Sequence, residues 1–222
     1  MKFLGAANHH EMTEGIAQLF LGMDLKCAKC HDHPSVDDWK QAHYWGLFTY
    51  LNQTKLATNS KDKQTYLVEG LATKKVEFQS VFETEKKNTG PRLPGGKEIE
   101  IPTFEKGQEF ENPAADGLPA VPKFRPRELL ARDLTAKDNT YFVRNSVNRF
   151  WFLMMGRGLV HPLDEVHGKN PPSHPTLLDL LAKEFVAHGF DVKWLLREIA
   201  LSKSYQRSSR LPAKAKSVEA SS

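Results

Sequence analysis

Both cysteines of this 222-residue chain lie in one short stretch, Cys27-Ala-Lys-Cys30-His31. A Cys-x-x-Cys-His sequence is the attachment signature of c-type haem, in which two thiols bond to the edge of the porphyrin and the imidazole that follows binds the iron. Residues three apart lie on the same side of a helical turn, so both sulfurs can reach one edge of a flat ligand. The stretch therefore predicts covalent haem c on Cys27 and Cys30, with His31 as the proximal iron ligand.

The ligand on the opposite face of the iron is not fixed by this pattern. His33 is two residues from His31, so it is not expected to reach the other face of the same ring. Candidates lie near the motif and in the C-terminal part of the chain: His9, His10, Met12, Met23, His43, Met154, Met155, His161 and His174. A histidine–methionine pair would give a higher reduction potential than two histidines, and an open position would permit ligand chemistry.

Two other interpretations of the motif stay open. Cys27, Cys30, His31 and His33 are ligands of the types that zinc prefers, although zinc frameworks usually place their two ligand pairs far apart. The alternative function is therefore a zinc-stabilised structural or interaction module. In the third interpretation the two cysteines serve only the fold, as reduced side chains or as a disulfide.

The composition is ordinary for a globular protein, with 40% hydrophobic and 26% charged residues. A net charge of +4 without a long basic run gives no indication of a nucleic-acid-binding groove. No apolar run approaches the ~20 residues of a membrane span. The apolar start at residues 3–7 is too short for the core of a signal peptide, so no export signal is predicted. Covalent haem is nevertheless attached outside the cytoplasm, so the motif predicts a periplasmic or otherwise extracytoplasmic location.

Apolar periodicity predicts two helices around the motif. Apolar residues at 3–4 spacing between residues 16 and 23 indicate a helix over about His10–Gly22. A second helix is predicted over about Asp38–Gln53, capped by Asp37 or Asp38. Its aromatic face is typical of core packing and also suits the wall of a haem cavity.

The middle of the chain changes to a period-2 pattern. Alternating residues predict strands over Thr65–Glu69, Lys75–Glu83 and Glu98–Phe104, separated by segments rich in Gly, Pro and Asn. These indicate a small antiparallel sheet with long loops.

Helical patterns return at Pro126, which suits the first position of a helix. Further helices are predicted over about Thr140–Met155 and Pro175–His188, the latter capped by Ser173, and a fourth follows a cap at Asp191. The predicted fold is mainly α with a small antiparallel β insertion, an α+β protein. Its expected parts are a helical Cys-x-x-Cys-His part over 1–55, a β-containing insertion and linker over 56–124, a helical C-terminal domain over 125–207, and a disordered tail over 208–222.

Two blocks of this sequence resemble known families. The run from Phe20 to Pro34, with Trp39 and the Tyr44-Trp-Gly-Leu that follows, resembles the end of the planctomycete cytochrome-associated domain. The second block resembles the usual C-terminal companion of that domain through Arg127-Glu-Leu-Leu-Ala-Arg, Asp138-Asn-Thr-Tyr-Phe-Val-Arg, Asn148-Arg-Phe-Trp, Gly156-Arg-Gly-Leu-Val, Asn170-Pro-Pro-Ser-His-Pro, Gly189-Phe-Asp-Val-Lys-Trp-Leu and Ser202-Lys-Ser-Tyr-Gln.

Both families are of unknown biochemical function, and their longer members are exported and often carry a separate cytochrome c domain. The resemblance implies a haem- or redox-associated, extracytoplasmic protein. The redox chemistry expected of the motif requires a redox partner protein, which the sequence does not identify. The long helical region that precedes the motif in the family is absent from this sequence. A fragment or a shortened member is therefore expected, with a missing N-terminal region or a larger assembly. Ser35 also stands where the family usually has an aromatic residue.

One further polar cluster lies in the predicted loop after residue 156: His161, Asp164, Glu165, His167 and His174. It could form a second metal site or an acid–base site, or be polar because its prolines and glycines keep it at the surface. Arg144, Arg149 and Arg157 are expected to pair with carboxylates. No Ser-His-Asp order, phosphate loop or paired-carboxylate spacing is present, so electron transfer or haem-dependent redox chemistry is expected rather than hydrolysis.

Overall fold

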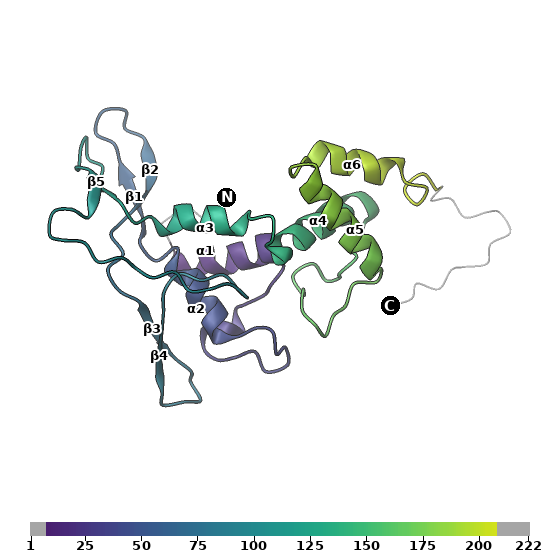
Figure 1. Ribbon diagram of the computed structural model, residues 1–222, viewed down its shortest axis with the longest axis horizontal. Helices are drawn as coiled ribbons and strands as arrows, with labels where there is room; N and C mark the ends of the chain where they lie inside the picture. The colour runs from purple at the N-terminus through teal and green to yellow at the C-terminus, as the bar shows by residue number, and fades with distance from the viewer. Residues whose placement is uncertain (1–7, 208–222) are drawn as a thin grey trace.

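The first helical segment lies immediately before the cysteine motif. In the computed structural model, which describes residues 8–207, α1 runs over His9–Ile16 (Figure 1). Its cap, Asn8, accepts hydrogen bonds from two backbone N–H groups of the first turn. The helix continues as a π-helix over Ala17–Leu21 and ends at Gly22, whose φ of 69° lies in the left-handed region. The predicted helix and its stop are confirmed.

The second helix, α2 (Gln41–Thr49), begins later and ends earlier than predicted. The predicted caps are wrong, because Asp38 accepts a hydrogen bond from the backbone N–H of Gly168 instead. The acidic partner of the helix start is Asp32, which accepts from the backbone N–H of Gln41 at 2.8 Å. Residues 33–39 are held away from the helix because they contact the C-terminal part of the chain.

The middle of the chain forms three separate two-stranded antiparallel sheets rather than one small sheet. The pairs are β1 (Thr54–Thr58) with β2 (Thr65–Glu69), β3 (Val76–Gln79) with β4 (Lys86–Thr89), and β5 (Phe110–Asn112) with β6 (Val121–Pro122). β2 has its predicted bounds. The strand predicted over Glu98–Phe104 is wrong: Ile99 donates its backbone N–H to the carbonyl of Pro91, and Glu98 pairs with Lys75, so this segment is a loop.

Four helices follow the hairpins: α3 (Pro126–Leu134), α4 (Thr140–Met155), α5 (Pro175–Ala187) and α6 (Val192–Leu201). α4 has its predicted bounds and ends at Gly156, with a φ of 79°. Asp191 caps α6 as predicted, by accepting from the backbone N–H of Trp194. The predicted cap at Ser173 is wrong, because its hydroxyl donates to the carbonyl of Leu159 and the residue before α5 is His174.

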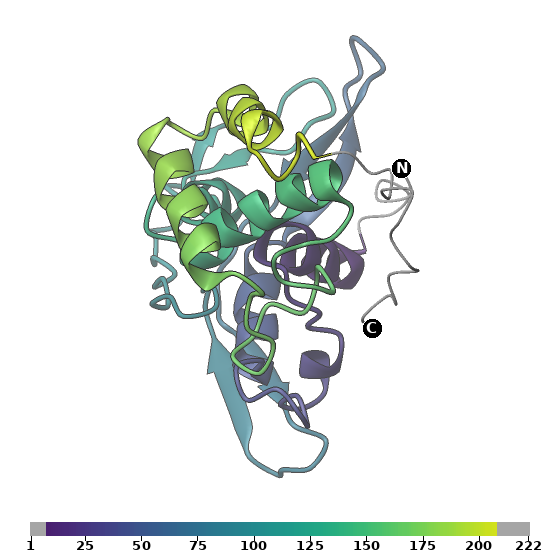
Figure 2. The ribbon, with the colours of Figure 1, turned by 90° about the vertical axis from the view of Figure 1, so that its right-hand side faces the viewer.

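Two hydrophobic clusters hold the described residues together. The first joins the N-terminal helices, the motif turn and α3: Ala17, Leu21, Met23, Leu25, Ala28, Val36, Trp39, Tyr44, Leu47, Tyr50, Leu51, Leu93, Leu130 and Leu134. The second joins α4, α5, α6 and the loop after α4: Val147, Leu159, Val160, Leu178, Phe185, Leu195 and Ile199. α4 contacts the π-helix that continues α1, and Figure 2 shows α4 beside this N-terminal helical segment, so this region connects the two clusters.

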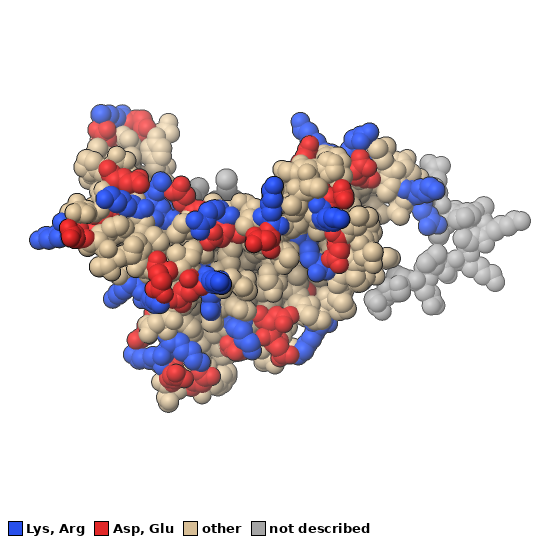
Figure 3. Space-filling model, viewed as in Figure 1, with Lys and Arg blue, Asp and Glu red and all other residues tan. Residues whose placement is uncertain are grey.

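The architecture is the predicted α+β mixture, with hairpins at one end and α4–α6 at the other (Figure 1). None of the helices within residues 8–207 is long and apolar enough to cross a membrane. Acidic and basic side chains are mixed over the face shown in Figure 3. The part boundaries proposed from the sequence stay predictions, and the predicted tail over 208–222 lies outside the described residues.

Candidate functional site

The two cysteines lie on a single exposed turn. Cys27–Lys29 is a 3-10 helix, and the backbone N–H groups of Cys30 and His31 both donate to the carbonyl of Cys27, at 3.1 and 3.3 Å. Both cysteines are exposed and free, so the disulfide considered as an alternative is not formed. The turn therefore presents two accessible thiols and leads directly into His31.

Other elements fix the backbone of this turn from two sides. The carbonyl of Lys29 accepts hydrogen bonds from the side chains of Gln41 and Trp45 in α2, at 3.3 and 3.1 Å. The carbonyl of Cys30 accepts from the backbone N–H of Val81, just after β3, at 3.0 Å. The aromatic face of α2 thus packs in the core and also positions the motif.

His31 presents one ring nitrogen as a free acceptor. Its Nδ1 lies 2.6 Å from the carbonyl oxygen of Asp32. A carbonyl oxygen can only accept, so Nδ1 carries the proton of the neutral ring and Nε2 keeps its lone pair. The ring centroid lies 5.1 Å from that of Phe82, which is 80% exposed. Phe82 therefore gives the imidazole an apolar neighbour at the surface.

His33 has the opposite tautomer. Its Nδ1 accepts hydrogen bonds from the backbone N–H groups of Ser35 and Val36, at 3.2 and 3.0 Å. The proton of the neutral ring is therefore on Nε2, and no free lone pair remains. The ring also packs edge-on against Trp39 at 5.2 Å between centroids. His33 organises the turn after the motif and is not available as a ligand in this arrangement.

Asp32, between the two histidines, anchors the turn to α2. Burial raises the pKa of its carboxyl group, but the hydrogen bond from Gln41 and the Lys40 ammonium at 3.2 Å outweigh this, so the net pKa is lowered. Asp32 is thus held ionised. This anchoring role of Asp32 was not predicted from the sequence. The available signal was an acidic residue shortly before a lysine, Lys40, that directly precedes the apolar run of α2.

Several candidates for the second axial ligand are engaged elsewhere. Met23 is fully buried, and His9 contacts the carbonyl of Thr54 at 2.7 Å. His10 contacts the hydroxyl of Tyr44 at 2.7 Å and stacks on Phe48. Burial lowers the pKa of His10 most, and the ammonium of Lys29 lowers it further, so His10 lies within electrostatic reach of the motif.

The C-terminal candidates have local partners. His161 stacks on Phe152, with centroids 6.3 Å apart, and His174 contacts the Ser173 hydroxyl at 3.1 Å. Among residues 8–207, no three His, Cys, Asp or Glu side chains converge where they could hold a metal ion. Neither the four alternative zinc ligands nor the loop cluster is therefore arranged as a closed metal site.

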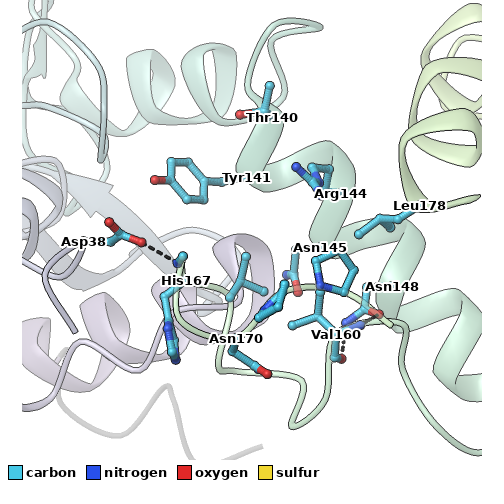
Figure 4. A pocket seen from close by; sticks show the side chains of 14 residues that line it. Asp38, Thr140, Tyr141, Arg144, Asn145, Asn148, Val160, His167, Asn170 and Leu178 are labelled. Atoms are coloured by element: carbon cyan, nitrogen blue, oxygen red, sulfur yellow. Dashed lines mark hydrogen bonds between the residues drawn. The ribbon is translucent and has the colours of Figure 1, made fainter. Parts of the chain in front are cut away.

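The loop between α4 and α5 is organised by side chains of α4. Asn148 is buried and binds both backbone groups of Val160, at 2.8 and 2.9 Å (Figure 4). Arg149 pairs with Asp164, and His167 contacts the carboxylate of Glu165 at 3.1 Å. The predicted pairing of Arg144 is also found, with Asp179 at 3.4 Å.

This loop contacts the segment that follows the motif. The backbone N–H of Gly168 donates to Asp38 at 2.6 Å, and Lys169 pairs with Asp37 at 3.0 Å. The rings of Trp39 and His167 pack at right angles, with centroids 5.1 Å apart. The two blocks singled out in the sequence are thus joined through residues 33–39.

Fold and motif together define an α+β protein with an exposed Cys-x-x-Cys-His turn. Residues 3–56 match the family model PSCyt2, described as a protein of unknown function (DUF1549), and residues 126–222 match PSD1, described as a protein of unknown function (DUF1553). These matches agree with the pair of families that the sequence resembles, and they leave residues 57–125 unmatched. No curated protein and no solved structure matches the chain.

Proposed function

We propose that this chain is a c-type haem protein, with haem bonded to Cys27 and Cys30 and with His31 as the proximal ligand, and that it serves in electron transfer. The observation that carries the proposal is the hydrogen bond from Nδ1 of His31 to the carbonyl of Asp32. Such a bond orients a ligating imidazole and leaves Nε2 free for the metal. The same turn also carries the two free, exposed thiols of Cys27 and Cys30.

The spread of these donors also supports haem over a single zinc ion. A tetrahedral zinc site needs its ligands gathered around one point, and the described residues contain no such gathering. Haem attachment needs thiols at the porphyrin edge and only the imidazole at the metal. Because His33 uses its lone pair on backbone N–H groups, it adds no fourth zinc ligand.

The residues of the chain would hold the cofactor in defined ways. Cys27 and Cys30 would fix the porphyrin edge, and the Lys29 carbonyl, bound by α2, would keep their spacing. The exposed apolar side chains of Val81 and Phe82 lie at the end of the turn and would cover part of the macrocycle. Bound haem supplies one-electron chemistry at its iron. Covalent attachment implies an extracytoplasmic location.

The test is intact mass spectrometry of the protein made in a host with haem-maturation machinery. The mass should increase by one covalent haem, and Cys27→Ala should lose proper attachment because one thioether is missing. His31→Ala should change the visible spectrum of the haem protein, whereas the matched variant His33→Asn should not. An unmodified mass with stoichiometric zinc would overturn the proposal and favour the zinc-stabilised module.

A further inference from the structure

Two large apolar side chains lie exposed at the turn of the β3–β4 hairpin, next to the cysteine motif. Phe82 is 80% exposed and Val81 is 66% exposed. A single exposed apolar residue is common at a protein surface. The contacts of these two residues, rather than their exposure alone, indicate what covers them.

The turn that carries them has a fixed conformation. The backbone N–H groups of Phe82 and Glu83 donate to the hydroxyl and the carbonyl of Ser80, each at 3.2 Å. The side chain of Gln79 donates to the carbonyl of Glu83 at 2.8 Å, across the base of the turn. The backbone of Phe82 is therefore held by its own turn, although its ring is exposed.

Gln41 joins this hairpin to the motif turn. β3 and β4 contact α2, which begins at Gln41 (Figure 1). The side chain of Gln41 is buried, and its Nε2 donates to the carbonyl of Lys29 at 3.3 Å and to the carbonyl of Gln79 at 3.0 Å. A primary amide nitrogen carries two protons, one for each of these acceptors. One buried side chain thus fixes the hairpin relative to the thiol turn.

The hairpin also contacts the motif directly. The backbone N–H of Val81 donates to the carbonyl of Cys30 at 3.0 Å. The ring of Phe82 packs against the ring of His31, with centroids 5.1 Å apart and planes at 50°. Nδ1 of His31 is bound to the carbonyl of Asp32, so this contact leaves Nε2 free. An apolar side chain therefore lies against the imidazole that the proposed function assigns to the iron.

The lysines of the hairpin pair with its own glutamates. Lys87 pairs with Glu83 at 2.7 Å, and Lys86 pairs with Glu77 at 2.9 Å. The turn thus offers apolar contact area beside the motif rather than free cationic groups. This suits a flat, largely apolar macrocycle better than an anionic ligand.

We propose that the β3–β4 hairpin, positioned by Gln41, is an apolar wall of the haem site and raises the reduction potential of the bound haem. This role rests on the proposed function. The iron–porphyrin core is positively charged in the ferric state and neutral in the ferrous state, and exclusion of water disfavours the charged state. The hairpin lies within residues 57–125, so the wall comes from a segment that neither family model matches.

The test is spectroelectrochemical titration of the haem-loaded full chain, with intact mass as the measure of attachment. Phe82→Ala should lower the ratio of reduced to oxidised protein at a fixed potential about threefold, or about 28 mV for one electron. Phe82→Leu keeps an apolar side chain and should lower it less. Phe110→Ala, which removes an exposed ring from β5 of another hairpin, should leave the potential unchanged. Both phenylalanines are exposed, so these variants should fold.

Gln41→Met keeps the length of the side chain but removes both donors, and it tests the positioning role. The variant should lower the potential, because the hairpin loses its link to the thiol turn. In the double variant with Phe82→Ala, the loss should be smaller than the sum of the two single losses, since both changes remove the same shielding.

The outcomes separate the wall from the haem assignment. An unmodified mass overturns the proposed function and the wall with it. Attached haem with equal potentials in Phe82→Ala and Phe110→Ala overturns the wall alone. Additive losses in the double variant overturn the positioning role of Gln41.

Discussion

At the scale of single residues, His31 and His33 differ in the nitrogen that carries the proton. Nδ1 of His31 meets a carbonyl, whereas Nδ1 of His33 meets two backbone N–H groups. Two histidines that look equivalent in the sequence therefore have different roles. One offers a lone pair outward, and the other stabilises the turn in the manner of a capping side chain.

This difference predicts the effect of changing His33 on stability. His33→Ala should lower the free energy of unfolding by about 1–2 kcal/mol, because two backbone N–H groups lose their acceptor. His33→Asn should recover most of this loss, since the asparagine Oδ1 can accept the same bonds. Urea unfolding followed by circular dichroism measures both. Equal losses in the two variants would contradict the capping role.

The single turn that carries the motif was predictable from the sequence, but the hydrogen-bond partners of its side chains were not. Cys27, Cys30 and His31 lie on one turn as their spacing predicts. The tautomers of His31 and His33 depend on which backbone groups their rings meet, and periodicity carries no information on that. The hydrogen bond from the side-chain amide of Asn145 to the carbonyl of Leu19 joins residues 126 positions apart in the sequence, so no local pattern predicts it.

At the scale of secondary-structure elements, α4 positions the loop that follows it. The side-chain amide of Asn148, which is 1% exposed, donates a hydrogen bond to the backbone carbonyl of Val160 and accepts one from the backbone N–H of Val160. The loop is long and has no strand or helix of its own up to Pro175. Its shape therefore depends on such anchors.

Asn148→Ala should therefore lower the free energy of unfolding by about 2–3 kcal/mol, because two buried backbone groups of Val160 lose their partners. Leu153→Ala, on the exposed side of the same helix, is the control and should change it by less than about 0.5 kcal/mol. Chemical denaturation gives both values. A loss at Asn148 no larger than that at Leu153 would show that the loop is held by other contacts.

Elements with strong local signals were predictable, and those set by tertiary contacts were not. α4 has a regular apolar face and a glycine stop, and both ends were predicted. The start of α2 was misplaced because Asp38 is used by Gly168, far along the chain. Ser173 likewise binds Leu159 rather than capping α5. A short polar residue before a helix is a capping signal only when nothing else competes for its side chain.

At the scale of the whole molecule, the two family-matched blocks form one connected structure. The backbone carbonyl of Gly22 accepts a hydrogen bond from the N–H of Val166, and the backbone N–H of Asp24 donates to the backbone carbonyl of Asp164. Arg149 of α4 donates to the carbonyl of Gln18 at 2.6 Å and pairs with Asp164. These polar contacts are partly or fully shielded from water, so both blocks should unfold together.

Arg149→Met tests this coupling. The variant should lower the free energy of unfolding by about 1–3 kcal/mol, because hydrogen bonds of a charged, mostly buried group are lost. The control is Arg197→Met, which removes an exposed pair with Glu198 and should have little effect.

Fluorine NMR of 5-fluorotryptophan-labelled protein follows each block separately, through Trp39 and Trp45 in one and Trp151 and Trp194 in the other. All four native resonances should vanish at one urea concentration, which Arg149→Met lowers for all of them, as expected of a single cooperative transition. Separate midpoints for the two pairs in the unsubstituted protein would show instead that the blocks unfold independently, and that the contacts of residues 18–24 and 33–39 join them without coupling their stability.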